Sequence, residues 1–213
     1  TPEDAFLASG TPMLDMGALK AYMDEDVAEP EARGFFVEVM GKVRWNEDRL
    51  GIVSIWEFPQ PYKEYVLGSD HAEGLDTGDY TAAILLCRLP FEQVATIRGF
   101  DGRQVGIAEF AEQMHFLCRY YNKAWACPEN NKDGGTVCAL LQEWGYARVI
   151  SEANVTPTAH GSNRLGWNNN GQTRRKGIGM MQTTVKEREV VLRDKRLITE
   201  MMHLVNKNGK TQA

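Results

Sequence analysis

Two acidic residues, Asp70 and Glu129, stand at the ends of two short apolar stretches of this sequence. Asp70 follows the run that begins Tyr65-Val66-Leu67, whose side chains favour a buried strand, and Glu129 follows a second short strand expected at 124–127. An amphipathic helix is expected between the two strands, because apolar residues recur at three- and four-residue steps over 105–121. If the strands are adjacent and parallel, both carboxylates emerge at the same edge of the sheet.

A pair of neighbouring carboxylates has a defined chemistry. Two carboxyl groups a few ångströms apart raise each other's pKa unless a cation holds them together. Oxygen ligands without His or Cys favour Mg²⁺ or Mn²⁺, so Asp70 and Glu129 are candidate metal ligands. Two such ions about 3.5–4 Å apart would activate a water and stabilise the leaving oxygen in phosphodiester cleavage. The residue types are also compatible with a simpler interpretation, in which Asp70 caps an acidic, solvated turn and Glu129 ends an exposed strand.

The elements around this pair alternate between strands and helices. Two strands, 35–45 and 50–58, are expected to form a hairpin with its turn at 46–49, and a three-strand meander begins at Tyr65. Helices are expected at 105–121, at 136–144 ending on Gly145, at 173–189 and at 194–206. Strand–helix–strand order implies parallel pairing through crossover helices. The chain is therefore expected to be an α/β protein with a mixed sheet.

Composition bounds the class of protein. A chain of 213 residues with 43% hydrophobic content suits one compact domain with an extension, or two small ones. No apolar run approaches the about 20 residues of a membrane span, and the first residues lack the features of a signal peptide. Four cysteines without a C-x-x-C pair predict reduced, buried thiols. The net charge of −5 argues against a generally basic nucleic-acid binder, though not against one with its cations on a single face.

One stretch concentrates positive charge. Residues 153–186 contain no Asp or Glu. Such a segment is a candidate DNA-binding face, because its cations would neutralise phosphates with little base specificity. The alternative is an ordinary basic loop followed by a solvated helix start. The cations that we assign to DNA binding are Arg164, Arg174, Arg175 and Lys176.

Several strings together resemble the large terminase subunit of tailed bacteriophages. Gly68-Ser-Asp70-His-Ala-Glu73-Gly74, followed by Gly78-Asp79-Tyr80, is similar to the first catalytic motif of that family, and Tyr121-Asn122-Lys-Ala124 with Glu129-Asn130 is similar to the second. Thr1–Gly10 resembles the segment that leaves the family's ATPase domain. Later strings match in the same order, namely Leu165-Gly166-Trp167, Thr173-Arg174 and Asp194 to Glu200. The ordered set covers essentially the whole chain.

The resemblance implies an RNase H-like (RuvC-like) nuclease with a central mixed sheet flanked by helices. It implies that Asp70 and Glu129 hold two Mg²⁺ or Mn²⁺ ions, supported by Glu73, Gly74 and Asp79, in an endonuclease that cuts concatemeric viral DNA during genome packaging. Residues 1–33 would be the linker from a missing ATPase domain and residues 34–213 the nuclease domain. Double-stranded DNA, the portal protein, the small terminase subunit and the chain's own ATPase domain would be its partners, in the host cytoplasm.

Two departures from the family pattern matter. The third carboxylate of the family comes from an Asp-Asp pair just beyond the stretch matched by residues 208–213, where this sequence stops, so weaker metal binding is expected and catalysis by this chain alone stays open. No G-x-x-x-x-G-K-[ST] phosphate loop occurs, so the chain would cut DNA without pumping it. Two alternatives stay open: another RNase H-like nuclease such as a junction resolvase, or a non-catalytic docking fragment for the portal or the motor domain.

Overall fold

The computed structural model describes residues 11–71, 80–99, 105–131, 133–151, 164–207 and 210–212. The chain forms two compact units, one comprising Pro30–Asn170 and the other combining Thr1–Glu29 with Gly171–Ala213. The division into a linker at 1–33 and a nuclease domain at 34–213 stays a prediction.

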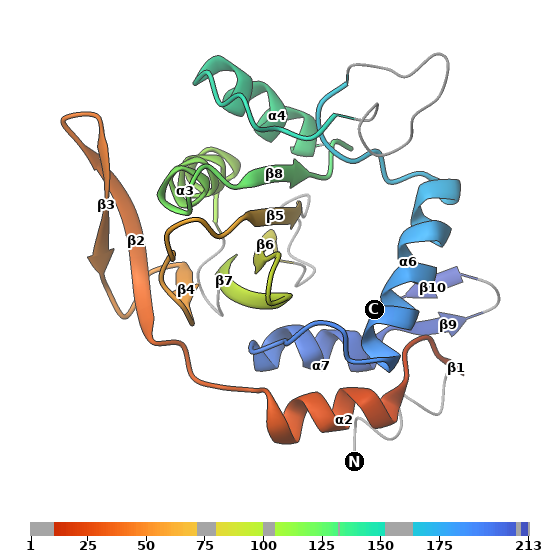
Figure 1. Cartoon of the computed structure of the whole chain (residues 1–213). Helices are drawn as coiled ribbons and strands as arrows, with labels where there is room; N and C mark the ends of the chain where they lie inside the picture. The colour runs from red at the N-terminus through yellow and green to blue at the C-terminus, as the bar shows by residue number, and fades with distance from the viewer. Residues whose placement is uncertain are drawn as a thin grey trace. The chain divides into compact units, whose positions relative to one another are not determined.

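The first unit is built on a seven-stranded mixed sheet with the strand order β3-β2-β4-β7-β6-β5-β8 (Figure 1). Every neighbouring pair is antiparallel except β5 and β8, which run parallel. The strands are β2 (Ala32–Val39), β3 (Lys42–Glu47), β4 (Val53–Ile55), β5 (Tyr65–Asp70), β6 (Ala82–Cys87), β7 (Glu92–Arg98) and β8 (Trp125–Pro128). The expected α/β class with a mixed sheet is confirmed, as is the meander, which is β5-β6-β7.

The first hairpin differs from the expectation. The stretch 35–45 is not one strand, because the chain turns at Met40 and Gly41, which adopt positive φ angles of 51° and 73°. The hairpin is therefore β2–β3, and β4 is a separate strand that pairs with the other edge of β2. A glycine in the left-handed region favours a tight two-residue turn between strands, and this local signal outweighs the continuous run of β-forming residues around it.

Two helices of this unit pack together and cover the sheet. Helix α3 (Ile107–Tyr120) buries Phe110, Met114 and Leu117 and packs against β2, β3 and β7, while α4 (Asp133–Glu143) packs against α3 and β8. The apolar residues of α3 recur at three- and four-residue steps, so one face of the helix is continuously buried against the sheet. Gly145 follows α4 with a φ of 69°, in agreement with its expected role at the helix end.

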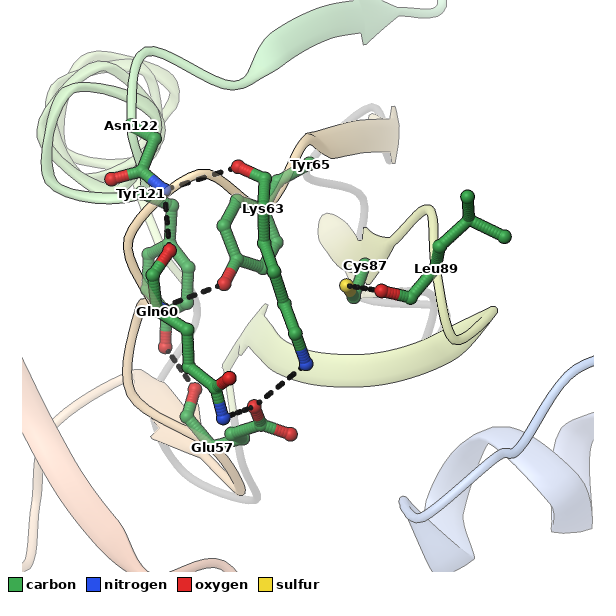
Figure 2. Close-up of polar contacts among 8 residues, drawn as sticks. All are labelled: Glu57, Gln60, Lys63, Tyr65, Cys87, Leu89, Tyr121 and Asn122. Atoms are coloured by element: carbon green, nitrogen blue, oxygen red, sulfur yellow. Dashed lines mark hydrogen bonds and ion pairs between the residues drawn. The ribbon is translucent and has the colours of Figure 1, made fainter.

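The C-terminus of α3 anchors the loop that enters β5 (Figure 2). Tyr121 donates its hydroxyl to the carbonyl oxygen of Glu57 at 2.7 Å. The Asn122 amide donates to two carbonyl oxygens of the same loop, those of Gln60 at 2.7 Å and Lys63 at 3.0 Å. Because β8 begins three residues after Asn122 and β5 begins two residues after Lys63, these contacts hold the entrances to both strands together.

His115 of α3 is buried beside the end of α4. Its ring stacks on Trp144 with 5.3 Å between centroids and an interplanar angle of 17°, and it meets Tyr146 edge-on at 5.5 Å. Burial lowers the pKa of His115 below its usual value of 6.5, Arg119 lowers it further, and Glu38 acts in the opposite direction. The folded protein therefore favours the neutral imidazole, and the unfolded chain takes up the proton first as the pH falls.

We expect the contribution of His115 to stability to be complete above pH 6.5 and to be lost as the pH falls below it. The free energy of unfolding, measured with urea between pH 8 and pH 5, should therefore fall more steeply for the wild type than for His115→Phe. His71, whose pKa is also lowered by burial, is present in both proteins and cancels in the comparison. Equal slopes would contradict the prediction.

The second unit pairs the two ends of the chain. It contains α2 (Met16–Glu25), α6 (Gly171–Lys186), α7 (Lys195–His203) and a small sheet in the order β1-β9-β10, made of Thr11–Pro12, Val205–Lys207 and Lys210–Gln212. Arg188 forms ion pairs with Glu25 and Asp26 and lies over the ring of Tyr22. Asp194 caps α7 and pairs with Arg196 at 2.7 Å. In the described parts of the chain, no helix is long and apolar enough to span a membrane.

Candidate active site

The parallel pair β5–β8 places Asp70 and Glu129 side by side. Ser69 is in register with Pro128, and the backbone N–H of Glu129 donates to the carbonyl oxygen of Ser69 at 2.9 Å. The next residue on each strand is therefore one of the two candidate ligands. Side chains alternate between the faces of a sheet, so residues in register on neighbouring strands point the same way. The arrangement expected from the sequence, two carboxylates at one edge of the sheet, is present.

The two carboxyl groups interact with each other. The pKa of Glu129 is raised above its usual value, first by burial and then by the hydrogen bond and the negative charge of Asp70. The side-chain amides of Asn169 and Asn131 act in the opposite direction, because they donate to the ionised form. Asp70 itself is exposed, and one of its oxygens accepts the backbone N–H of His71 at 2.9 Å. The pair thus combines an exposed carboxylate with a partly buried one.

His71 lies beside the pair and packs against helix α3. Its ring meets Phe110 edge-on with 5.3 Å between centroids, and its Nε2 lies 3.3 Å from the hydroxyl of Ser69. Burial lowers the pKa of this histidine, while the charges of Asp70 and Asp133 raise it. The imidazole therefore supports the end of β5 from the helix side of the sheet.

A segment of the acid-free stretch, 164–169, encloses Glu129 from its other side. Trp167 forms a parallel bridge with Glu129, donates its N–H to Pro128 at 2.7 Å and accepts the N–H of Asn130 at 2.8 Å. Gly166 is buried with a φ of 82°, and a Cβ there would lie 2.9 Å from the sulfur of Cys138. Only glycine suits this position, because it combines the left-handed backbone with close contact to α4.

Asn130 and Asn131 tie this segment to the strand end, and the sequence did not identify either as a site residue. Asn130 is 2% exposed and donates its amide to the carbonyl oxygen of Leu165 at 2.9 Å. Asn131 donates to Glu129 Oε1 at 3.1 Å and to the carbonyl oxygen of Asn169 at 2.9 Å. The one feature of the sequence that could have indicated this role is the clustering of asparagines: two directly follow Glu129, and three more occupy 168–170.

Comparison with known structures identifies the fold. No protein-family model and no curated protein matches this chain. The large terminase nuclease of the thermophilic phage G20c with bound magnesium matches it with a TM-score of 0.61 and 13% identity, over 93% of this chain and 87% of that one. The large terminase nuclease domain of Thermus phage P74-26 matches with a TM-score of 0.57 and 14% identity, over 91% and 83%.

This chain has the fold of a large terminase nuclease domain. The expected RNase H-like architecture, a central mixed sheet flanked by helices, is confirmed. The same phage G20c nuclease with bound zinc matches with a TM-score of 0.58 and 14% identity, over 91% of each chain.

The other residues expected at the site of this terminase nuclease fold lie in different places. Glu73, Gly74 and Asp79 fall outside the described residues. Arg164 donates its guanidinium to the carbonyl oxygen of Asn130 at 3.2 Å, one residue after Glu129. The remaining expected DNA-binding residues, Arg174, Arg175 and Lys176, are exposed on α6, in the other unit.

The carboxylate pair has the donor chemistry of a magnesium or manganese site. Asp70 and Glu129 repel each other when both are ionised, and the charge of Asp70 raises the pKa of Glu129. A divalent cation bound between them would neutralise this repulsion. Among the described residues, no group of three acidic, His or Cys side chains is arranged to hold a metal ion. Proteins commonly hold Mg²⁺ with one or two carboxylates, and waters and substrate phosphates complete the coordination. Two oxygen ligands at a partly exposed strand edge fit that pattern.

Proposed function

We propose that this chain is a metal-dependent DNA endonuclease that cuts concatemeric viral DNA during genome packaging. The observation that carries the proposal is the juxtaposition of Asp70 and Glu129 on a terminase nuclease fold. Large terminase nucleases with this fold have been crystallised with bound magnesium, zinc and cobalt, which supports the use of a divalent ion. We expect Asp70 and Glu129 to bind two Mg²⁺ or Mn²⁺ ions.

In the proposed reaction, Asp70 and Glu129 hold the ions and keep them at the sheet edge. The bound ions would supply a nucleophilic water and stabilisation of the leaving oxygen of the phosphodiester. The His71 backbone N–H donates to the Asp70 carboxylate, and the side-chain amides of Asn131 and Asn169 donate to that of Glu129, so both carboxylates are positioned before DNA arrives. Arg164, whose guanidinium donates to the residue after Glu129, would bind a phosphate of the DNA. Glu73, Gly74 and Asp79 are proposed as supporting residues of the site.

The proposed partners follow from this role. Double-stranded DNA is the substrate, and the portal protein, the small terminase subunit and an ATPase domain of the same protein would deliver it. The place of action would be the cytoplasm of the infected host, where concatemeric DNA is packaged.

The experiment that tests the proposal is cleavage of supercoiled plasmid in Mn²⁺ or Mg²⁺. Nicked and then linear plasmid should appear, and EDTA should abolish both products. No metal-dependent cleavage, by this chain or by one that continues past residue 213 to include the expected Asp-Asp pair, would overturn the proposal. Cleavage of a four-way junction much faster than of linear duplex would instead favour a junction resolvase.

The exposed cations of α6 lead to a separate prediction about DNA binding. Each phosphate neutralised on duplex DNA contributes about 0.9 to the slope of log affinity against log salt concentration. Replacing Arg174 and Arg175 by alanine should therefore weaken duplex binding at low salt and reduce the slope by about 2. Lys20→Ala, which removes an exposed cation from α2, is the matched control and should leave the slope unchanged. Unchanged affinity and slope in the double variant would show that α6 is not part of the DNA-binding face.

A further inference from the structure

The side-chain amide of Asn131 contacts both parts of the candidate site. Its nitrogen lies 3.1 Å from Glu129 Oε1 and 2.9 Å from the carbonyl oxygen of Asn169. A primary amide carries two N–H groups, so it can make both hydrogen bonds at once. One bond fixes the asparagine to segment 164–169, and the other reaches the carboxylate.

The backbone around Glu129 is already held without this amide. The N–H of Glu129 donates to Ser69, and Trp167 exchanges hydrogen bonds with the residues on either side of Glu129. What these bonds leave undetermined is the rotation of the Glu129 side chain, because a glutamate has three rotatable bonds beyond its backbone. The Asn131 amide supplies a fixed partner for Oε1, and together with the side-chain amide of Asn169 it favours one direction of the carboxylate.

We propose that Asn131 is a positioning residue that orients Glu129 toward a divalent ion. The inference rests on the proposed function, because it assigns a role toward the metal of that same site. Hydrogen bonds that orient a ligating carboxylate are worth about 10–100-fold in metal affinity. Because Asn131 is itself tied to Asn169, the direction of Glu129 depends on segment 164–169, which also carries Arg164.

Binding of Mn²⁺ in the absence of DNA tests the role without relying on turnover. The loss of the free-ion signal in electron paramagnetic resonance reports the fraction of Mn²⁺ bound at each concentration. Asn131→Ala should raise the Kd for Mn²⁺ about 10-fold or more. In cleavage assays the same variant should raise the Mn²⁺ concentration for half-maximal rate and leave the KM for DNA unchanged.

Asn122→Ala is the matched control. Asn122 also donates its amide nitrogen to two carbonyl oxygens, at 2.7 and 3.0 Å, but it lies before the opposite end of β8. The Asn122→Ala variant should have a lower thermal stability than the wild type and the same Kd for Mn²⁺. If Asn122→Ala weakens Mn²⁺ binding as much as Asn131→Ala, the effect is general loosening of the fold and the inference is overturned.

The remaining outcomes separate the inference from the proposed function. Wild-type protein that binds Mn²⁺, together with an Asn131→Ala variant of equal affinity, would overturn the positioning role and leave the nuclease proposal standing. Wild-type protein that binds no Mn²⁺ at millimolar concentration would overturn both.

Discussion

Asp70→Ala is expected to abolish metal-dependent cleavage of supercoiled plasmid, with a rate loss of about 10³-fold or more. Loss of a metal ligand removes several kcal/mol of transition-state stabilisation, and each 1.36 kcal/mol corresponds to a factor of ten. Glu129→Ala should produce a loss of the same order, because the two carboxylates act on the same ions. Gel quantification of nicked and linear plasmid over time measures both rates.

The loss should not come from unfolding. Asp70 is exposed, and its carboxylate is one reason that the pKa of Glu129 is raised, so its removal relieves repulsion in the folded state. The thermal midpoint of Asp70→Ala should match or slightly exceed that of the wild type. Glu64→Ala is the matched control. Glu64 is an exposed acid directly before the first residue of the same strand, β5, and forms an ion pair with the exposed Arg88. Wild-type cleavage by both site variants would refute the assignment of the site.

Gly134→Ala is expected to destabilise the protein strongly. Gly134 is buried at the start of α4, and a Cβ there would overlap the carbonyl oxygen of Glu129 and lie 2.9 Å from His71 Nδ1. The helix start must therefore move away from the strand end that carries Glu129. Overpacking of this kind costs about 1–3 kcal/mol, which lowers the Tm of a chain of this size by roughly 3–10 °C. Cleavage should fall together with stability, because both overlapping groups belong to the site.

The adjacent glycine supplies the control for this prediction. A Cβ on Gly135 would lie 3.6 Å from the carbonyl oxygen of Asn130, an ordinary van der Waals contact. Alanine stabilises a helix interior relative to glycine by up to about 1 kcal/mol, so Gly135→Ala should leave Tm unchanged or raise it. Thermal melts should therefore show a lower Tm for Gly134→Ala alone, and equal decreases in both variants would contradict the packing described for Gly134.

The juxtaposition of Asp70 and Glu129 could be predicted because it depends on strong local patterns. Each residue ends an apolar strand, and the amphipathic helix between the strands requires a crossover, which makes parallel pairing the natural outcome. The β2–β3 hairpin was placed incorrectly because its turn consists of two residues inside an unbroken run of strand-forming side chains. A two-residue turn leaves almost no trace in hydrophobic periodicity.

The surroundings of Glu129 were less predictable for a different physical reason. Segment 164–169 is held by single bridges and by side-chain amides, so it has neither the period of a helix nor that of a strand. The left-handed backbone of Gly166 and the donor role of Asn131 become visible only when the partners, Pro128 and Glu129, are in place. The acid-free composition of 153–186 indicated DNA binding but did not distinguish Arg164, beside Glu129, from the cations of α6 in the other unit.

The parallel pairing of β5 with β8 also determines when, during folding, the site comes into existence. Antiparallel neighbours such as β5 and β6 lie close in the chain, and contacts between nearby residues close quickly. β5 and β8 can join only after β6, β7 and α3 have been synthesised, and segment 164–169 adds its contacts still later. A nascent chain that ends before β8 carries Asp70 without its partner carboxylate. In the proposed nuclease, the two candidate metal ligands would come together only after β8 has been made, so partly made chains would not cut DNA.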